Sequence, residues 1–229
     1  MSERPILFSA PMIRAILAGT KSQTRRVAPI SDLSINQFGV DLLTWSVRFS
    51  KPVRGVVASH SGGNFSRLDA RRIIAAQFCP YGQPGDRLWV REAFAIVPRT
   101  AYRCSEGVQQ ILRPDDDHDA AIYREGWVRS NGGFRWRPSI HMPRWASRIT
   151  LEITEVRVER LGEISEGDAY DEGAQAWAAE TVRDGNKYPN VVSAFRALWE
   201  SINGAGSWDA NPYVWVVSFR RVEQEARKP

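Results

Sequence analysis

The segment from Arg148 to Leu161 constrains the fold most, because apolar and polar residues alternate in it over the length of one long strand. The parity of its apolar positions changes once, between Ile153 and Val156. A shift of one residue in a period of two predicts a β-bulge near Thr154 and Glu155. A bulge in a long strand helps a sheet to curl, and we therefore expect a strongly curved sheet.

The other predicted elements are short, and strands outnumber helices. Further strands are expected at Pro5–Phe8, Arg87–Glu92, Ala120–Tyr123 and Tyr213–Val222. Hairpins are expected from Leu42–Phe49 with Val53–Ser59, and at Trp127–Trp136. Helices are expected from Ser9 to Gly19, from Ser165 with Asp168 in a capping box, and at Val191–Ile202. This order favours a mainly β, α+β chain: a barrel with appended helices.

Composition places the chain among compact proteins of a reducing compartment. It has 229 residues, of which 43% are hydrophobic, so it can bury a core. It contains no apolar run long enough to cross a bilayer and no secretory signal, and we expect no membrane association. Its two cysteines, Cys79 and Cys104, form no disulfide framework. We therefore expect a single cytoplasmic domain.

Positive charge and aromatic rings gather between Arg124 and Arg148. This stretch holds six arginines and one acid, Glu125, in a chain whose net charge is +5. Arginines bind phosphates and stack on bases, and aromatic faces accept any base. RNA or single-stranded nucleic acid is therefore the expected partner, bound by Arg135, Trp136, Arg137, His141, Arg144 and Trp145. The alternative is that the aromatic residues form core and the arginines a solvated face.

Several motifs resemble the ASCH superfamily, whose fold is PUA-like. Ile16–Arg26 resembles its opening motif, a helix that ends in Gly, followed by a Lys and then by Thr-x-x-Arg-like residues. Pro84–Val90 resembles its central strand. Glu163–Glu172 and the terminal strand Tyr213–Arg220 follow in the family's order. Longer phage and prophage members are similar at Cys79–Gly82, Ser139–Ala146 and Gly206–Pro212.

This resemblance implies one ASCH (PUA-like) β-barrel domain over residues 1–229, with insertions at about 31–75 and 96–135. It also implies that the first and last strands are neighbours and that the helix ending at Gly19 flanks the barrel mouth. Family members are inferred to bind RNA, so the expected ligand is RNA, a nucleotide or a modified nucleoside. No cofactor is implied.

One bacterial branch of the family removes the acetyl group from N-acetylated cytidine with a Thr, a Lys and a Glu. Its Lys and Thr match Lys21 and Thr24, and its Glu best matches Glu172, although Glu166, Asp168 and Asp171 are alternatives. Arg25 and Arg26 would be ligand-binding neighbours. The resemblance thus implies a base-binding protein, or alternatively an acetylcytidine amidohydrolase. A ribonuclease is a further alternative.

Metal chemistry is not expected. Asp115–Asp119 lacks the spacing of an EF-hand loop, and the histidines and cysteines lack paired zinc-ligand spacing. We therefore predict a site without metal or cofactor.

Overall fold

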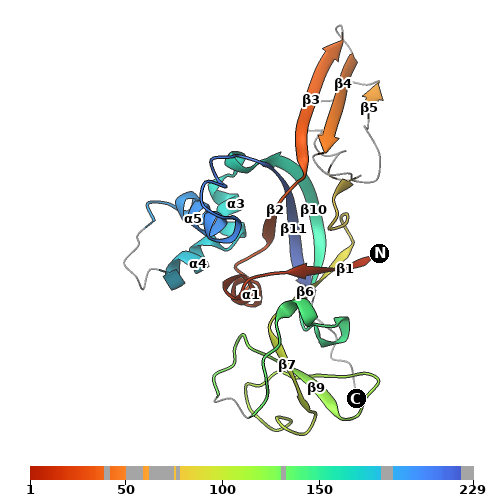
Figure 1. Ribbon diagram of the computed structural model, residues 1–229, viewed down its shortest axis with the longest axis vertical. Coiled ribbons are helices and arrows are strands. Elements are labelled where there is room, and N and C mark those ends of the chain that lie inside the picture. Colours follow the sequence, from red (N-terminus) through yellow and green to blue (C-terminus); the bar gives the residue numbers. More distant parts are fainter. Residues whose placement is uncertain are drawn as a thin grey trace.

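A five-stranded sheet with the order β1-β6-β10-β11-β2 forms the centre of the protein (Figure 1). The structure is a computed structural model and describes residues 1–38, 42–49, 59–61, 75, 78–129, 133–181 and 188–222. The five strands are β1 (Glu3–Leu7), β2 (Gln23–Val27), β6 (Arg87–Arg91), β10 (Thr150–Arg160) and β11 (Tyr213–Val222). β1 runs parallel to β6, and the other pairs are antiparallel.

The long strand β10 confirms the predicted bulge. Its register against β11 shifts between Ile153 and Glu155, which is where the apolar parity changes in the sequence. Residues of both parities are consequently buried on one side of the sheet, including Leu151 and Val158. The parity change thus has a structural cause in the strand itself.

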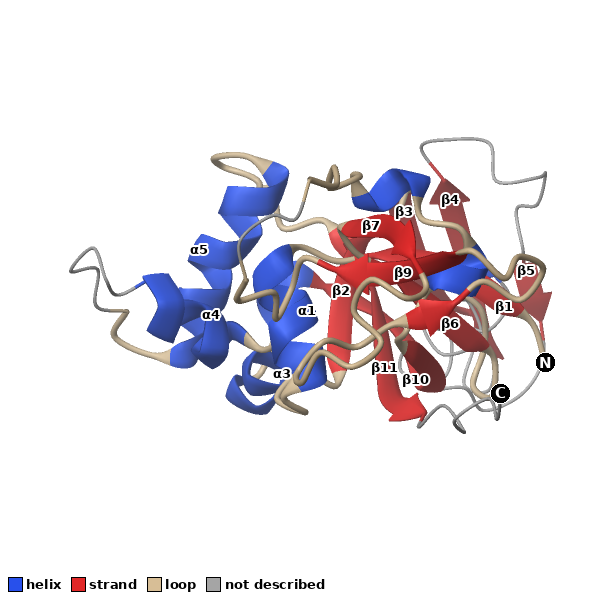
Figure 2. Ribbon diagram, turned by 90° about the horizontal axis from the view of Figure 1, so that it is seen from below, coloured by secondary structure: helices blue, strands red, loops and turns tan. Residues whose placement is uncertain are grey.

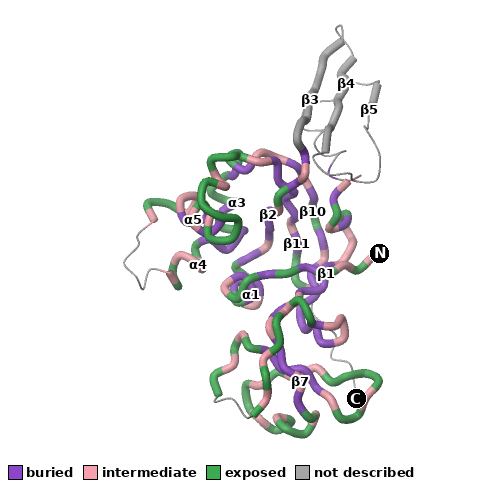
Figure 3. The backbone as a smooth tube through the Cα atoms, in the orientation of Figure 1, coloured by how far each residue is buried: buried purple, intermediate pink, exposed green. Residues whose placement is uncertain are grey.

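The helices gather on one side of the central sheet (Figure 2). They are α1 (Ala10–Leu17), α3 (Glu166–Asp171), α4 (Ala174–Thr181) and α5 (Val191–Asn203), with short 3-10 turns η1 (Ser139–His141), η2 (Arg144–Ala146) and η3 (Leu161–Glu163). Ile13 and Ile16 of α1 and Phe195 and Leu198 of α5 pack with the sheet residues in one core. The buried positions follow the central strands in Figure 3. Burial of the apolar side of each helix therefore holds the helical layer on the sheet.

Two smaller three-stranded sheets lie outside the central one, at opposite ends of the view in Figure 1. The first consists of β3 (Ile30–Phe38), β4 (Leu42–Phe49) and β5 (Ser59–Ser61). The second consists of β7 (Phe94–Pro98), β8 (Ile111–Leu112) and β9 (Asp119–Tyr123). Apart from the first residue of β3 and the start of β7, both sheets fall within the sequence ranges 31–75 and 96–135.

Two expectations about the strands are wrong, and the expected barrel is not shown. Within the described residues no sheet closes into a barrel, so the chain is a mixed α and β protein in which sheets dominate. The first strand, β1, is an edge strand beside β6, whereas the last, β11, lies between β10 and β2. Residues 127–129 and 133–136 form no strand. The strand expected at Val53–Ser59 lies outside the described residues except for Ser59, which begins β5 and pairs with β4. β4 also pairs with β3.

Most other predicted elements are confirmed within one or two residues. These are β1, α1, β4, β6, β9, β10, α5 and β11. Over the part of the chain that the structure describes, no helix has the length and apolarity to cross a membrane.

Candidate functional site

Glu172 is placed by the short helix α3. The hydroxyl of Ser165 accepts a hydrogen bond from the backbone N–H of Asp168, and the carboxylate of Asp168 accepts one from the backbone N–H of Ser165. This reciprocal capping box is the one that the sequence predicts, and it fixes the start of the helix. Glu172 then occupies the C-cap position and is buried.

Lys21 reaches Glu172 from the other end of the chain. The backbone turns at Gly19, whose φ is +74°, and two residues later the Lys21 side chain enters the interior. Its Nζ donates to Oε2 of Glu172 at 2.8 Å and to the Glu172 carbonyl at 2.7 Å. Burial lowers the pKa of the Lys21 amine against the opposing effect of Glu172, and the charges of Arg26 and Arg25 lower it further. The structure therefore brings together the predicted lysine and the first-choice carboxylate.

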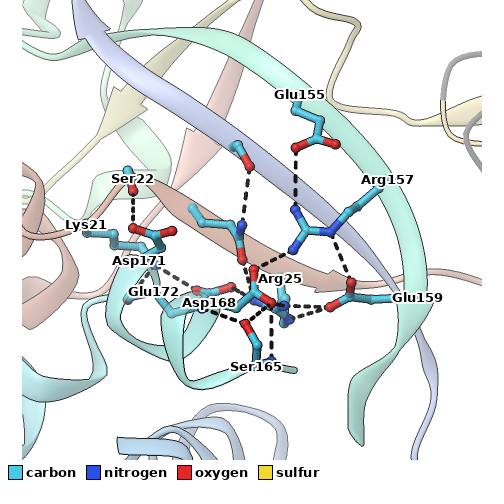
Figure 4. A network of polar contacts seen from close by, with 12 residues as sticks. Lys21, Ser22, Arg25, Glu155, Arg157, Glu159, Ser165, Asp168, Asp171 and Glu172 are labelled. Carbon is cyan, nitrogen blue, oxygen red and sulfur yellow. Dashed lines mark hydrogen bonds and ion pairs between the residues drawn. The ribbon is translucent and has the colours of Figure 1, made fainter. Parts of the chain in front are cut away.

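The second oxygen of Glu172 joins a buried ionic network around Arg25 (Figure 4). The Arg25 side chain is fully buried, and the groups around it come from β2, β10 and the α3 segment: Gln23, Glu159, Asp168 and Glu172. Arg157 of β10 also contacts Glu159 and Asp168. Although burial opposes it, hydrogen bonds from Ser165 and the charge of Arg25 lower the pKa of Asp168 to about 2. Arg25 thus holds acids of the protein in place.

Thr24 and Arg26 face the opposite side of β2 from Arg25, because side chains alternate along a strand. Phe8 marks this second side: its ring centroid is 5.2 Å from Cζ of Arg26 and 5.7 Å from Nζ of Lys21. Thr24 is buried, and its side-chain hydroxyl forms no hydrogen bond with another described residue. Among the described residues Nε of Arg26 is likewise buried without a partner, while its Nη2 donates to the Leu7 carbonyl. Donor groups therefore remain available beside an aromatic ring.

Gly173 provides the space in which Lys21 lies. Its φ is +77°, and a Cβ added there would lie 3.1 Å from Cβ of Ala15 and 3.3 Å from Cβ of Lys21. Gly173→Ala is therefore expected to lower the free energy of unfolding by about 2 kcal/mol, through backbone strain and crowding together. Urea denaturation followed by circular dichroism measures this change.

Gly19 is the matched control for this prediction. Its φ of +74° is nearly the same, but a Cβ built on it meets nothing within 4 Å. Gly19→Ala should therefore lower the free energy of unfolding by about 1 kcal/mol, through backbone strain alone. Equal losses in the two variants would contradict the view that Gly173 makes room for Lys21.

The aromatic residues of the basic stretch belong to a local core. Trp136 packs edge to face on Trp127 and Phe134, with ring centroids 5.6 Å and 5.0 Å apart. These rings cover the face of the second small sheet that carries Ala95, Val97, Ala120 and Ile122. The contacts favour the alternative that the rings are core, since each of the three rings packs against the other two.

The basic residues of that stretch are divided among several environments. Arg135, Arg137 and His141 are exposed, and Arg144 pairs with Glu3 at 2.8 Å. Trp145 packs against the core around Phe94 and Met142. The structure therefore does not bring these predicted ligand contacts together with Lys21, Thr24 and Glu172 in one cluster.

Three residues of the site were missed by sequence reasoning: Phe8, Gln23 and Glu159. Glu159 was detectable, because Glu155, Arg157 and Glu159 alternate in charge along one side of β10. No sequence signal pairs Phe8 with Lys21 and Arg26, because that contact depends on how β1 and β2 are placed.

An open pocket of about 540 Å³ adjoins the site. Thr20 and Ser22 line one side, next to Lys21, and Asp171 and Gly173 line the other, next to Glu172. The hydroxyl of Ser22 donates to the Asp171 carboxylate at 2.8 Å. The Lys21 and Glu172 side chains do not line this pocket, so it is separate from the ionic contact.

Comparisons with family models, with curated proteins and with solved structures gave no match. The chemistry of the site therefore has to be inferred from its own residues. Among those that the structure describes, no group of three or more acidic, histidine or cysteine side chains could hold a metal ion.

Proposed function

We propose that the chain is an ASCH-type, PUA-like protein that binds RNA or a nucleotide and takes a base, modified or unmodified, into a site formed by Lys21, Thr24, Arg26 and Glu172. The observation that carries this proposal is the buried contact between Lys21 and Glu172, which are 151 residues apart. The same carboxylate also bonds Arg25. Nζ of Lys21 lies 5.7 Å from the centroid of the Phe8 ring, which also contacts Arg26, so Lys21 is the residue that links the ionic network to the second side of β2.

The groups on that side suit a nucleobase. A hydroxyl and a guanidinium can hydrogen-bond to the edge of a base, and the ring of Phe8, which is buried and packs on Phe219, lies next to two cations. The unpartnered Nε of Arg26 supports this proposal, because a buried donor without an acceptor gains free energy when a ligand supplies one.

Hydrolysis of N-acetylated cytidine is the second candidate, and the lowered pKa of Lys21 favours it. An amine can act as a base only when neutral, and this state is more accessible at a lowered pKa. In this reaction the Thr24 oxygen would bond to the acetyl carbon while its proton passes to Lys21. The proton then goes to the leaving cytidine nitrogen as the C–N bond breaks, and water hydrolyses the ester to release acetate. Glu172 would orient Lys21.

A panel of modified nucleosides and RNAs, followed by mass spectrometry for binding, turnover and RNA cleavage, tests the proposal. For a binding protein, Thr24→Ala should change the affinity by at most about 1 kcal/mol. For a hydrolase, the same change should abolish turnover and leave binding nearly intact. Thr181→Ala is the control, because the Thr181 hydroxyl donates to the Trp177 carbonyl within α4 and to no other residue that the structure describes. Failure of every panel member to bind would refute the proposal.

A further inference from the structure

The side of β6 opposite Leu88 and Val90 carries a set of arginines arranged around one tryptophan, Trp89, which is itself buried. Side chains alternate along this strand, so Leu88 and Val90 are buried in the core while Arg87, Trp89 and Arg91 share the other side. Cζ of Arg91 lies 4.7 Å from the Trp89 ring centroid. Cζ of Arg144, which comes from η2, lies 6.0 Å from it. Stacking on a ring restricts where a guanidinium can point, so these cations are already ordered.

We call Arg87, Trp89, Arg91 and Arg144 the cationic face. Arg144 is neutralised by Glu3, but within the described part of the chain neither Arg87 nor Arg91 has a carboxylate in ion-pairing range. Nε of both Arg87 and Arg91 is buried without a hydrogen-bond partner. An arginine with an unused buried donor gains more from an anionic acceptor than a fully solvated one does. Arg87 and Arg91 of the cationic face could therefore donate hydrogen bonds to an anionic ligand.

The cationic face adjoins the proposed base site through strand β1. Leu7 is paired with Arg91 in the parallel ladder, and the Leu7 carbonyl accepts the hydrogen bond from Arg26. Neighbouring strands are about 4.8 Å apart, so only the width of β1 separates the two sets of residues. Phe8 is the next residue after Leu7. A ligand that reaches Arg26 and Phe8 can thus continue over β1 onto the cationic face.

We infer that the ligand of the base site is a nucleotide within a single strand of nucleic acid, whose neighbouring phosphates bind the cationic face. This inference rests on the proposed base site and names the class of its ligand. A single strand is required because a base that enters a site must leave its stack, which costs least in an unpaired segment. The arginines would bind phosphate oxygens, which are the same in every sequence. Selectivity among ligands therefore depends on the base that enters the site.

The test compares a free nucleoside with a short single-stranded RNA that contains the same base, in wild type and in an Arg87→Gln, Arg91→Gln double variant. The wild type should bind the RNA more tightly, with an affinity that falls steeply as salt rises. Loss of two phosphate contacts should weaken RNA binding about fifteenfold at 0.15 M salt and reduce the slope of log affinity against log salt by about 1.4. Affinity for the nucleoside should not change.

Two further variants separate phosphate binding from folding and net charge. Arg87→Lys with Arg91→Lys keeps both charges and should retain most of the salt slope, even if Trp89 packs less well. Arg196→Gln removes a charge from α5, on the helical side of the sheet, and should leave RNA binding unchanged. Equal binding of nucleoside and RNA, or an unaffected RNA affinity in the double variant, would overturn the inference while the base site stands. If neither ligand binds wild type, the base site itself is wrong.

Discussion

Replacing Arg25 with methionine should lower the free energy of unfolding by about 3–5 kcal/mol. The substitution leaves the three carboxylates of Glu159, Asp168 and Glu172 in contact with two cations, Arg157 and Lys21, and the negative charge that is no longer balanced near the interior is costly. Methionine fills similar volume, so the loss should come from charge and not from a cavity. Urea denaturation at pH 7, followed by circular dichroism, measures the effect.

Arg157 is the matched control for this prediction. It contacts Glu159 and Asp168 as Arg25 does, but 20% of its side chain is exposed, whereas that of Arg25 is fully buried. Arg157→Met should therefore cost less than half as much, because water partly solvates the acids that remain. Equal losses would contradict the assignment of Arg25 as the residue that holds the network together.

Replacing Lys21 with methionine should weaken base binding by about 100-fold. The change removes the buried amine that lies between Glu172 and Phe8, and a hydrogen bond from a charged group to the base would contribute about 1.5–3 kcal/mol of binding free energy. Stability should fall by only about 1–2 kcal/mol, because the Glu172 carboxylate keeps its contact with Arg25 at 3.2 Å. Binding is measured by calorimetry with the tightest ligand of the nucleoside panel.

Ser22→Ala serves as the control for Lys21→Met. Ser22 is the next residue, but its hydroxyl bonds Asp171 beside the open pocket and not Glu172. The affinity of Ser22→Ala for the base should therefore remain within about twofold of wild type. This change is smaller than the loss of one hydrogen bond to the base would cause. Unchanged affinity in Lys21→Met, or a similar loss in Ser22→Ala, would mean that the base binds elsewhere.

Features set by neighbouring residues were predictable from the sequence. The bulge in β10 follows from the parity change after Ile153, and the start of α3 follows from the capping pair Ser165 and Asp168. The terminal strand was likewise found from its alternating pattern. In each case the signal lies within a few residues, where side-chain period and capping chemistry determine the backbone.

Features that depend on pairing between segments far apart in the sequence were not predictable from local patterns. No local rule states that β1 pairs with β6 and that β11 lies between β10 and β2. The segment around Trp127 and Trp136 has a hairpin-like pattern, yet its rings pack over the second small sheet and its described residues form no strand. Burial of aromatic area by the described residues there outweighs their local preference for paired strands.

The candidate site also combines features that the sequence predicted with features that depend on the sheet order. The meeting of Lys21 with Glu172 was expected from family resemblance alone, since nothing local joins residues 151 positions apart. Arg25 was expected to contact ligand, but its guanidinium is enclosed by acids of β10 and the α3 segment. Sequence reasoning identified the charged groups, whereas the sheet order determines which side of β2 each one faces.

A structure of the protein with the tightest ligand of the nucleoside panel would test the proposed base site most directly. We expect the base to lie against Phe8, within hydrogen-bonding distance of Thr24 and Arg26 and next to the Lys21–Glu172 pair. A base bound instead in the open pocket beside Ser22 and Asp171, or over the ring of Trp136, would contradict the proposed site.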